Sequence, residues 1–353
     1  MTATNNDGNA TSRRSPARPL LAGAPGYPAL EPVHEPHLHP ELAAWRRNVG
    51  SAVALDLAPR VAQPVTGLDV ICWNVAIGRA DLGELLRRMH DGAWDDFGNR
   101  RDRPLVLLLQ EAYRGGGDVP ERPLDRRHGG RIVPGRTDVI EIAEMMGYSL
   151  RYAPSMRNGL HRSDRGNAIL ANVALEGTHA FLLPYVRQRR VAITTHIAGV
   201  DDLVLASAHL DVGGSPPGEW QLRYGSGRLV QASELAHRLI DPEHGASVVL
   251  GADLNAALGT RDPVVRALLY GGLRLARRIG TWRHTYHGRV RLPLDYVLYR
   301  SPDERIREVT VTRIDEVPGD RSPSVFGSDH HPLFARVDFA EPIHPYTHDI
   351  PNE

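Results

Sequence analysis

Short, continuous apolar runs are the most regular feature of the chain. Residues 67–74, 104–111 and 247–250 are rich in Val, Leu and Ile and are bounded by polar or glycine-containing stretches. Runs of this length and composition are typical of strands that are buried on both faces of a sheet. We therefore expect three buried strands, each of which delivers polar residues to an edge of a sheet.

Apolar residues at helical spacing follow the first two runs, at residues 82–89 and 138–146. A longer helix is predicted from about residue 220 to 240. Residues 166–210 contain strand-like segments joined by turns, which indicates hairpins. Strands and helices alternate without an internal repeat, and this pattern predicts one α/β domain over residues 65–340.

The segments that flank this domain have a different composition. Residues 1–35 are rich in Asn, Gly, Ala, Pro and Arg without periodicity, which is typical of a disordered lead-in. Residues 36–64 are expected to form a short helix, from about residue 40 to 49, and a linker that packs on the domain. Residues 341–353 are rich in Pro and His and are expected to form a tail.

The overall composition is that of a folded protein without a strong charge bias. The 353 residues are 41% hydrophobic and 24% charged, and Lys plus Arg equals Asp plus Glu at 42 each. No net positive field would therefore draw the chain to nucleic acid or anionic lipid. The one cysteine, Cys72, lies in an apolar run and is expected in the core. Neither a signal-like apolar stretch nor a membrane span is recognisable, so we expect a cytoplasmic monomer.

Polar groups that could carry chemistry gather at the ends of apolar, strand-like runs in the C-terminal half. They are Asp253 with Asn255, then Asp295, then Asp329 with His330. Carboxylate and amide oxygens near imidazoles suit a hard cation such as Mg²⁺ or Mn²⁺, whereas a Zn²⁺ site would more often recruit Cys and several His in tight spacing. The chemistry indicated is metal-assisted attack on phosphate.

Seven blocks in a fixed order carry a resemblance to a known family. They are Trp73-Asn74, Gln110-Glu111, residues 165–170, His209-Leu210, residues 251–255, Thr281-Trp282 with residues 294–296, and residues 328–332. In this order the blocks resemble the endonuclease/exonuclease/phosphatase superfamily, which has the deoxyribonuclease-I-like fold. The resemblance implies an α/β (α+β) four-layer sandwich. In it, two mixed, mostly antiparallel β-sheets pack face to face with helices on both outer sides.

The resemblance also implies a role for each matching residue around the reacting phosphate. Asn74 and Glu111, with Asp329, match the positions that bind one Mg²⁺ or Mn²⁺ ion. Asp253 matches the residue that positions and polarises the attacking water, and Asn255 matches the one that helps to orient the water and the phosphate. Taken alone, an Asp-Leu-Asn sequence is more often a turn.

The histidines and the substrate-facing residues are implied in the same way. His209 and His330 match the pair that stabilises charge in the transition state, and Asp295 matches the acid that orients His330. Asn167 matches a block that lines the phosphate side of the cleft. Arg190 belongs to the basic run 187–190, which is either a phosphate clamp or a solvated strand edge, with Arg190 on the core side.

The implied enzyme is a Mg²⁺- or Mn²⁺-dependent hydrolase that cleaves phosphodiester bonds by in-line attack of water. The substrate class stays open between nucleic acid, nucleotides and phospholipids or inositol phosphates, because the superfamily uses one site plan for all of them. A basic loop at residues 122–136 would suit a nuclease, or is simply solvated. Two alternatives are a phosphomonoesterase of nucleotides or inositol phosphates, and a catalytically inactive binding or scaffold member of the fold.

Overall fold

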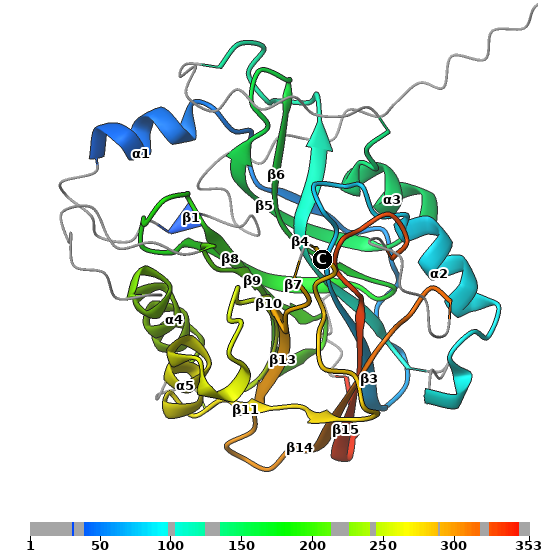
Figure 1. Cartoon of the computed structure of the whole chain (residues 1–353). Coiled ribbons are helices and arrows are strands. Elements are labelled where there is room, and N and C mark those ends of the chain that lie inside the picture. The colour runs from blue at the N-terminus through cyan, green and yellow to red at the C-terminus, as the bar shows by residue number, and fades with distance from the viewer. Residues whose placement is uncertain are drawn as a thin grey trace, which may run out of the picture.

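Two packed β-sheets form the centre of the protein, with helices on both outer faces (Figure 1). The computed structural model describes residues 30–31, 39–97, 103–123, 135–212, 226–240, 245–288, 290–317 and 325–345. Within these residues the first sheet has seven strands in the following spatial order: β1 Leu30–Glu31, β7 Leu175–Leu182, β8 Val191–Ile197, β9 Val200–His209, β10 Ser247–Asp253, β13 Asp295–Arg300 and β11 Arg274–Leu275.

The second sheet has eight strands within the same described ranges. Their spatial order is β12 Arg277–Arg278, β14 Ile306–Arg313, β15 Leu333–Ile343, β3 Val65–Asn74, β4 Leu105–Gly115, β6 Ser163–Ala171, β5 Ser149–Arg157 and β2 Val53–Leu55. Both sheets are mixed: β3 and β4 are parallel, as are β9 and β10, while most other neighbours are antiparallel. The predicted four-layer α+β sandwich is therefore confirmed.

Alternation of side chains along each strand divides the apolar residues between three cores. Val70 and Cys72 of β3 point to the core between the two sheets, which also contains Val249 of β10. Ile71 and Trp73 of β3 point the other way, into the core under the helices that cover the eight-stranded sheet. Because every second residue of a strand faces the same side, a continuous apolar run serves both cores at once. Cys72 is fully buried, as predicted.

Two pairs of helices complete the outer layers (Figure 1). α2 and α3 cover the eight-stranded sheet, and α4 and α5 cover the seven-stranded sheet. Each of the first two begins at an Asp cap: Asp81 accepts from the backbone N–H of Glu84, and Asp138 accepts from that of Ile140. The bounds of the helices are α1 His39–Arg46, α2 Leu82–His90, α3 Val139–Met146, α4 Ser226–Leu239 and α5 Pro263–Tyr270, with 3₁₀ turns at Asp95–Phe97 and Gly259–Arg261.

The flanking segments agree with the sequence only in part. The short helix expected from about residue 40 to 49 is present as α1, and Leu42 packs into the core between the sheets. β15 runs to Ile343, so the last strand extends beyond the predicted domain end at residue 340. The lead-in lies outside the described residues except for Leu30–Glu31, which pairs with β7. Residues 124–134 of the basic loop, residues 213–225 and the tail from residue 346 also lie outside them. Among the described helices, none is long and apolar enough to cross a membrane.

Candidate active site

Strand register brings three of the predicted residues side by side in the seven-stranded sheet, at the end where β9 and β10 finish and β13 begins. Asp253, the last residue of β10, pairs with His209 of the parallel strand β9. On its other side Asp253 pairs with Asp295 of the antiparallel strand β13. All three side chains are buried, with exposed fractions of 1%, 4% and 3% in that order. This end of the sheet therefore collects two carboxylates and one imidazole away from bulk water.

Two of the polar clusters that were expected at strand ends lie at strand beginnings instead. Asp295 is the first residue of β13, and His330 lies three residues before β15. The physical reason is the antiparallel direction of these strands. An antiparallel strand begins at the edge where its neighbour ends, so a residue at its start reaches the same edge as Asp253.

Glu111 was expected at the end of its strand, but β4 continues to Gly115. The pairing of β4 with β6 is interrupted between Leu109 and Ala112, and Glu111 has a left-handed backbone with φ of 52°. Such irregularities re-aim a side chain without ending the strand. Asn255 also has a positive φ, of 51°, just beyond the end of β10. Two of the predicted site residues thus depend on unusual backbone conformations.

The carboxylate of Asp253 is the centre of a hydrogen-bond network. Oδ2 accepts from Asn74 Nδ2 at 2.8 Å and lies 3.3 Å from His209 Nε2. Oδ1 accepts from the backbone N–H of Asn255 at 3.0 Å. The Asn255 side chain in turn donates to the carbonyl of Leu210 at 3.0 Å. One carboxylate therefore joins residues from both sheets.

His330 is held on the other side of Asp253. Its Nδ1 lies 2.8 Å from Asp295 Oδ2, and its Nε2 lies 4.0 Å from Asp253 Oδ2. Trp73 Nε1 donates to the backbone carbonyl of His330 at 2.8 Å, and the ring of Tyr286 packs on the imidazole with centroids 4.9 Å apart. Because Asp295 accepts at Nδ1, Nε2 is the nitrogen that is directed toward Asp253.

The charges in this cluster shift its titration strongly. Burial alone would lower the pKa of His330, but the carboxylates around it, first Asp295 and then Asp253 and Asp329, together outweigh burial and raise the pKa of His330 to about 10. Burial, followed by the negative charge of Asp295, raises the pKa of Asp253 to about 7. His330 is therefore an imidazolium at neutral pH, and it holds a proton next to a carboxylate that is costly to ionise.

His209 has the opposite character. Burial, with the positive charges of Arg190 and His330 next in size, lowers the pKa of His209 well below its usual value. The Arg190 guanidinium lies 3.1 Å from His209 Nδ1. Since a guanidinium can only donate, Nδ1 accepts, and the proton of the neutral ring is on Nε2, which lies 3.2 Å from Asn255 Nδ2 and 3.3 Å from Asp253 Oδ2. The two histidines thus present one charged and one neutral imidazole to the same carboxylate.

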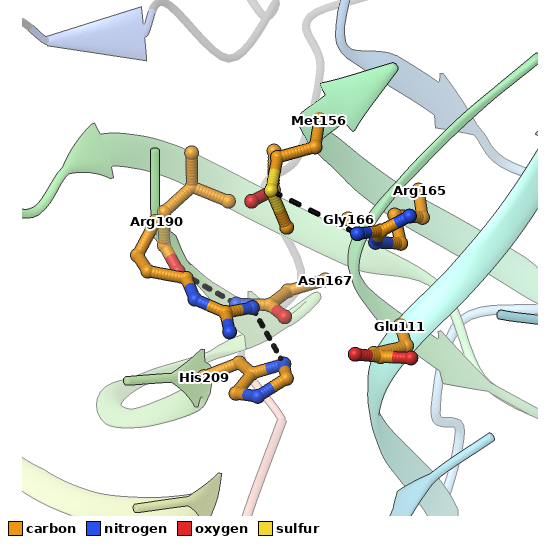
Figure 2. Close-up of a pocket in the computed structure, with 9 residues that line it drawn as sticks. Glu111, Met156, Arg165, Gly166, Asn167, Arg190 and His209 are labelled. Carbon is orange, nitrogen blue, oxygen red and sulfur yellow. Dashed lines mark hydrogen bonds between the residues drawn. The ribbon is translucent and has the colours of Figure 1, made fainter. Parts of the chain in front are cut away.

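A small pocket with a free volume of about 10 Å³ is lined by His209, Glu111, Arg165, Asn167 and Arg190, among others. Figure 2 shows the Glu111 carboxylate facing the pocket from the side opposite Arg190 and His209. Asn167 Nδ2 donates to the backbone carbonyl of Val191 at 2.7 Å, which leaves its amide oxygen for a ligand. Arg190 is on the core side, as expected, and is 3% exposed. A carboxylate, an amide oxygen and two guanidinium groups therefore share one small space.

The three residues implied as metal ligands lie on three separate segments of the eight-stranded sheet, at the end of β3, within β4 and shortly before β15. Asn74 Oδ1 accepts from the backbone N–H of Ala76 at 3.0 Å, and Glu111 faces the pocket. Asp329 is half-buried, and its backbone carbonyl accepts from His287 at 2.7 Å. Within the described residues, neither Glu111 nor Asp329 belongs to a group of three acidic or imidazole side chains whose ligand atoms come within 4.8 Å of one another. Two such groups exist. The first is Asp253 with Asp295 and His330, and the second is His284 with His287 and His331.

Some residues of the site could not be recognised as such in the sequence. Arg165 lies in a recognised block, but it was given no role, and it lines the pocket. Thr285 Oγ1 accepts from the backbone N–H groups of Leu294 and Asp295 at 3.0 Å each, which fixes the start of β13. Tyr286, which packs on His330, lies in an aperiodic polar segment. The local sequence around Thr285 and Tyr286 contains no signal for these contacts, because they depend on tertiary folding.

Comparison with known proteins adds a family match. Residues 71–330 match the model of the Endonuclease/Exonuclease/phosphatase family. The comparison with curated protein sequences gives no match.

Solved structures with a similar fold share little sequence with this chain. An endonuclease/exonuclease/phosphatase family protein from Leptotrichia buccalis C-1013-b is 13% identical over 77% of this chain and 100% of its own, with a TM-score of 0.49. The human Nocturnin catalytic domain with bound sulfate anion is 16% identical over 82% and 98%, with a TM-score of 0.48. Sphingomyelinase C from Streptomyces griseocarneus is 17% identical over 77% and 99%, with a TM-score of 0.44.

Proposed function

Because the chain belongs to the endonuclease/exonuclease/phosphatase family, we propose that it is a metal-dependent phosphoesterase that hydrolyses phosphodiester bonds by in-line attack of water. The family's members act on phosphoester bonds. The proposed substrate is a phosphodiester of a nucleic acid, a nucleotide or a phospholipid. Water is the nucleophile in this proposal, so no covalent enzyme intermediate is required.

The observation that supports this function best is the arrangement around Asp253. Its buried carboxylate is flanked by a neutral imidazole, His209, at 3.3 Å and by a charged one, His330, at 4.0 Å. A carboxylate in this position can accept a hydrogen bond from water and align the water for attack on phosphorus. The imidazole N–H groups beside it are oriented donors for the negative charge that develops on the phosphate oxygens.

The oxygen donors near the pocket fit a divalent cation. Glu111 presents a carboxylate to the pocket, and Asn74 presents an amide oxygen that accepts one backbone hydrogen bond. A set of oxygen donors is the chemistry that Mg²⁺ or Mn²⁺ prefers. We propose that Glu111 and Asn74, assisted by Asp329, hold the cation. When bound, it would polarise a phosphate oxygen and offset charge on the leaving group.

The remaining residues have supporting roles in this proposal. Asp295 accepts the Nδ1–H of His330 and so fixes the direction of the second N–H group, at Nε2. Arg190 keeps Nδ1 of His209 occupied, so that Nε2 is the donor. Asn255 helps to orient Asp253, whose Oδ1 accepts its backbone N–H. Asn167 and Arg190 would contact the substrate from the pocket wall.

The first test compares a diester with a monoester. Wild type and Asp253→Asn would be assayed with bis(p-nitrophenyl) phosphate and with p-nitrophenyl phosphate, in Mg²⁺, in Mn²⁺ and in a chelator. We expect metal-dependent turnover of the diester, and we expect kcat to fall by roughly 10²–10⁴-fold in the variant, the range for loss of a positioned acid or base. Asp96→Asn, which changes an exposed aspartate in the 3₁₀ turn at Asp95–Phe97, is the matched control and should retain full activity.

The cationic groups on the pocket wall favour a second candidate, a phosphomonoesterase. Arg165 and Arg190 both line the small pocket and could contact a terminal phosphate group at its mouth. Turnover of the monoester alone would replace the diesterase proposal with this one. If neither compound is hydrolysed with either metal, both the diesterase and the monoesterase proposals are contradicted for these substrates. Mn²⁺ binding by wild type that is lost in Glu111→Gln would then show that the protein binds metal without hydrolysing them.

A further inference from the structure

A second cluster of titratable side chains lies beside the candidate active site and has no part in the proposed reaction. It consists of His284, His287 and His331, whose ligand nitrogens lie within 4.8 Å of one another. His284 Nε2 and His287 Nε2 are 3.1 Å apart, and the rings of His287 and His331 have centroids 4.1 Å apart. His287 and His331 are buried, and His284 is partly buried. Three imidazoles packed this closely need a physical explanation.

His331 contributes an observation of its own. Its Nδ1 lies 3.0 Å from Asp315 Oδ1 and 3.1 Å from the carbonyl oxygen of Ile314, so this nitrogen carries the proton and donates. Its Nε2 is buried and has no hydrogen-bond partner. An unpartnered buried lone pair is unfavourable. Metal-binding histidines typically have this arrangement, in which a carboxylate contacts one ring nitrogen and the other nitrogen has a free lone pair.

The spacing of the nitrogens is close to that of a coordination site. Two nitrogens bound tetrahedrally to Zn²⁺ at about 2.0–2.1 Å lie about 3.3 Å apart. The Nε2 atoms of His284 and His287 are already at 3.1 Å. Bringing the third nitrogen from at most 4.8 Å to the same spacing requires a movement of about 1.5 Å, which side-chain rotation can supply.

We propose that His284, His287 and His331 bind one transition-metal cation of the Zn²⁺ class, at a site separate from the oxygen-lined pocket. Imidazole nitrogens suit Zn²⁺, Cu²⁺ and Ni²⁺, whereas Mg²⁺ prefers oxygen donors such as Glu111. The two sites therefore differ in the metal that they select. Metal binding at the histidine cluster is also independent of whether the chain hydrolyses phosphate.

Arg313 is the group that competes with a cation at this cluster. Its Nη1 lies 3.1 Å from His284 Nε2 and donates to the lone pair that a metal would use. Two contacts with Asp315, both at 2.9 Å, offset the guanidinium charge and offer Arg313 another position. Burial, followed by the charge of Arg313, lowers the pKa of His284 to about 4, so this imidazole is neutral at pH 7. A bound cation would displace Arg313 from His284 but not from Asp315.

The location of the cluster gives the cation a structural role. The backbone N–H of His287 donates to Asp329, and that of His331 donates to Thr285, each at 2.7 Å. The segment 284–287 therefore runs beside the segment 329–331, which carries His330. A cation that is bound by residues of both segments would fasten them together next to the packed rings of Tyr286 and His330.

Binding of Zn²⁺ alone, measured by isothermal titration calorimetry with Mg²⁺ in large excess, tests this proposal. We expect one Zn²⁺ per chain in wild type and in Glu111→Gln, which removes a ligand of the other site. His331→Ala should weaken binding by more than about 100-fold. Asp315→Asn should weaken it by about 10–100-fold, which is the usual effect of losing an outer carboxylate. His90→Ala, at an exposed histidine in α2, is the matched control and should bind Zn²⁺ as wild type does.

Co²⁺ gives a second readout, its visible absorption. Tetrahedral Co²⁺ absorbs visible light much more strongly than octahedral Co²⁺. An intense visible band in wild type and in Glu111→Gln that is lost in His331→Ala would therefore indicate a tetrahedral site that includes His331. Circular dichroism of His331→Ala would show whether that variant folds. Absence of both Zn²⁺ binding and the Co²⁺ band in wild type would overturn the proposal and leave a hydrogen-bonded histidine cluster only. Zn²⁺ binding that is lost in Glu111→Gln and retained in His331→Ala would also overturn it.

Discussion

At the scale of single residues, the pKa of each histidine in the candidate site depends on the charged side chain that contacts its Nδ1 atom. Asp295 contacts Nδ1 of His330, and Arg190 contacts Nδ1 of His209. Burial disfavours the charged form of both imidazoles. Carboxylates outweigh burial at His330, whereas the positive charge of Arg190 adds to it at His209, so the pKa values of the two rings shift in opposite directions. The proposed division of labour between the two histidines therefore originates in their partners.

Replacing Asp295 with Asn should show whether Asp295 affects the reaction step, through His330, without affecting substrate binding. Asp295→Asn removes the charge that keeps His330 protonated, while the side chain keeps its size. We expect kcat for the diester to fall by roughly 10²–10⁴-fold with little change in KM, because His330 is proposed to act in the transition state. The measurement is steady-state kinetics as a function of pH, in which the pH profile of the variant should also change shape.

Asp262→Asn is the matched control for that experiment. Asp262 is also a buried aspartate, but its Oδ1 accepts from the backbone N–H of Val264 at the start of α5. Asn is an equally good cap at this position, so both kcat and stability should change little. An equal loss of kcat in both variants would contradict a specific role for Asp295.

At the scale of strands and helices, the sequence predicts those elements that the local periodicity of apolar residues determines. The apolar runs that end at Asn74 and Asp253 are recognisable because both strands are buried on both faces. The bulge at Glu111 cannot be recognised in the sequence, because a left-handed residue inside a strand does not change the apolar periodicity. The positions of Asp295 at the start of β13 and of His330 shortly before β15 depend on antiparallel pairing, which is a property of the sheet. The cluster of His284, His287 and His331 depends on folding between distant segments and could not be predicted from spacing.

The packing of β10 on β4 offers a test of the core between the sheets. A Cβ added at Gly251 would meet Cβ and Cδ1 of Leu108 at 2.9 Å and Cβ of Cys72 at 3.0 Å. Gly251→Ala should therefore lower the free energy of unfolding by about 1–3 kcal/mol, the usual cost of overpacking. Denaturant unfolding of the variant is the measurement.

A second substitution shows whether the contact itself is responsible. Leu108→Ala removes Cδ1, one of the two Leu108 atoms that the new methyl group would meet, and should cost about 2–5 kcal/mol by itself. Adding Gly251→Ala to that background should then cost less than it does in wild type. Costs that simply add would show that the two residues do not interact, contrary to the packing described above.

At the scale of the whole molecule, charged groups hold the sheet together at the end opposite the candidate site. Arg103 contacts Asp338 at 2.7 Å and Asp69 at 3.3 Å, and these residues tie the start of β4 to β15 and β3. Asp338 pairs with Gly67 near the start of β3, whereas Asn74 is at its other end. The two ends of the sheet therefore carry separate networks, one around Arg103 and one at the candidate site.

The pH dependence of stability should reflect this distal network. Burial would raise the pKa of Asp338, but hydrogen bonds from Arg103 and Arg336 outweigh burial and lower it. A lowered pKa contributes stability that is fully present above the unfolded-state value of about 3.9 and is lost as the pH falls through the lower folded value. The melting temperature of wild type should therefore fall more steeply below pH 4 than that of Asp338→Asn. Asp96→Asn should follow wild type, and identical curves for all three proteins would contradict a contribution from Asp338.

The candidate site is shared between the two sheets. Asn74 and Glu111 come from the eight-stranded sheet, and His209, Asp253 and Asp295 come from the seven-stranded sheet. During refolding, a chain in which the sheets are formed but not docked would not bring these two sets of residues together. Recovery of catalysis should then trail the recovery of strand signal in circular dichroism and coincide with burial of the core between the sheets. The rate at which the proposed activity recovers would therefore measure the rate of sheet docking, the last step of folding.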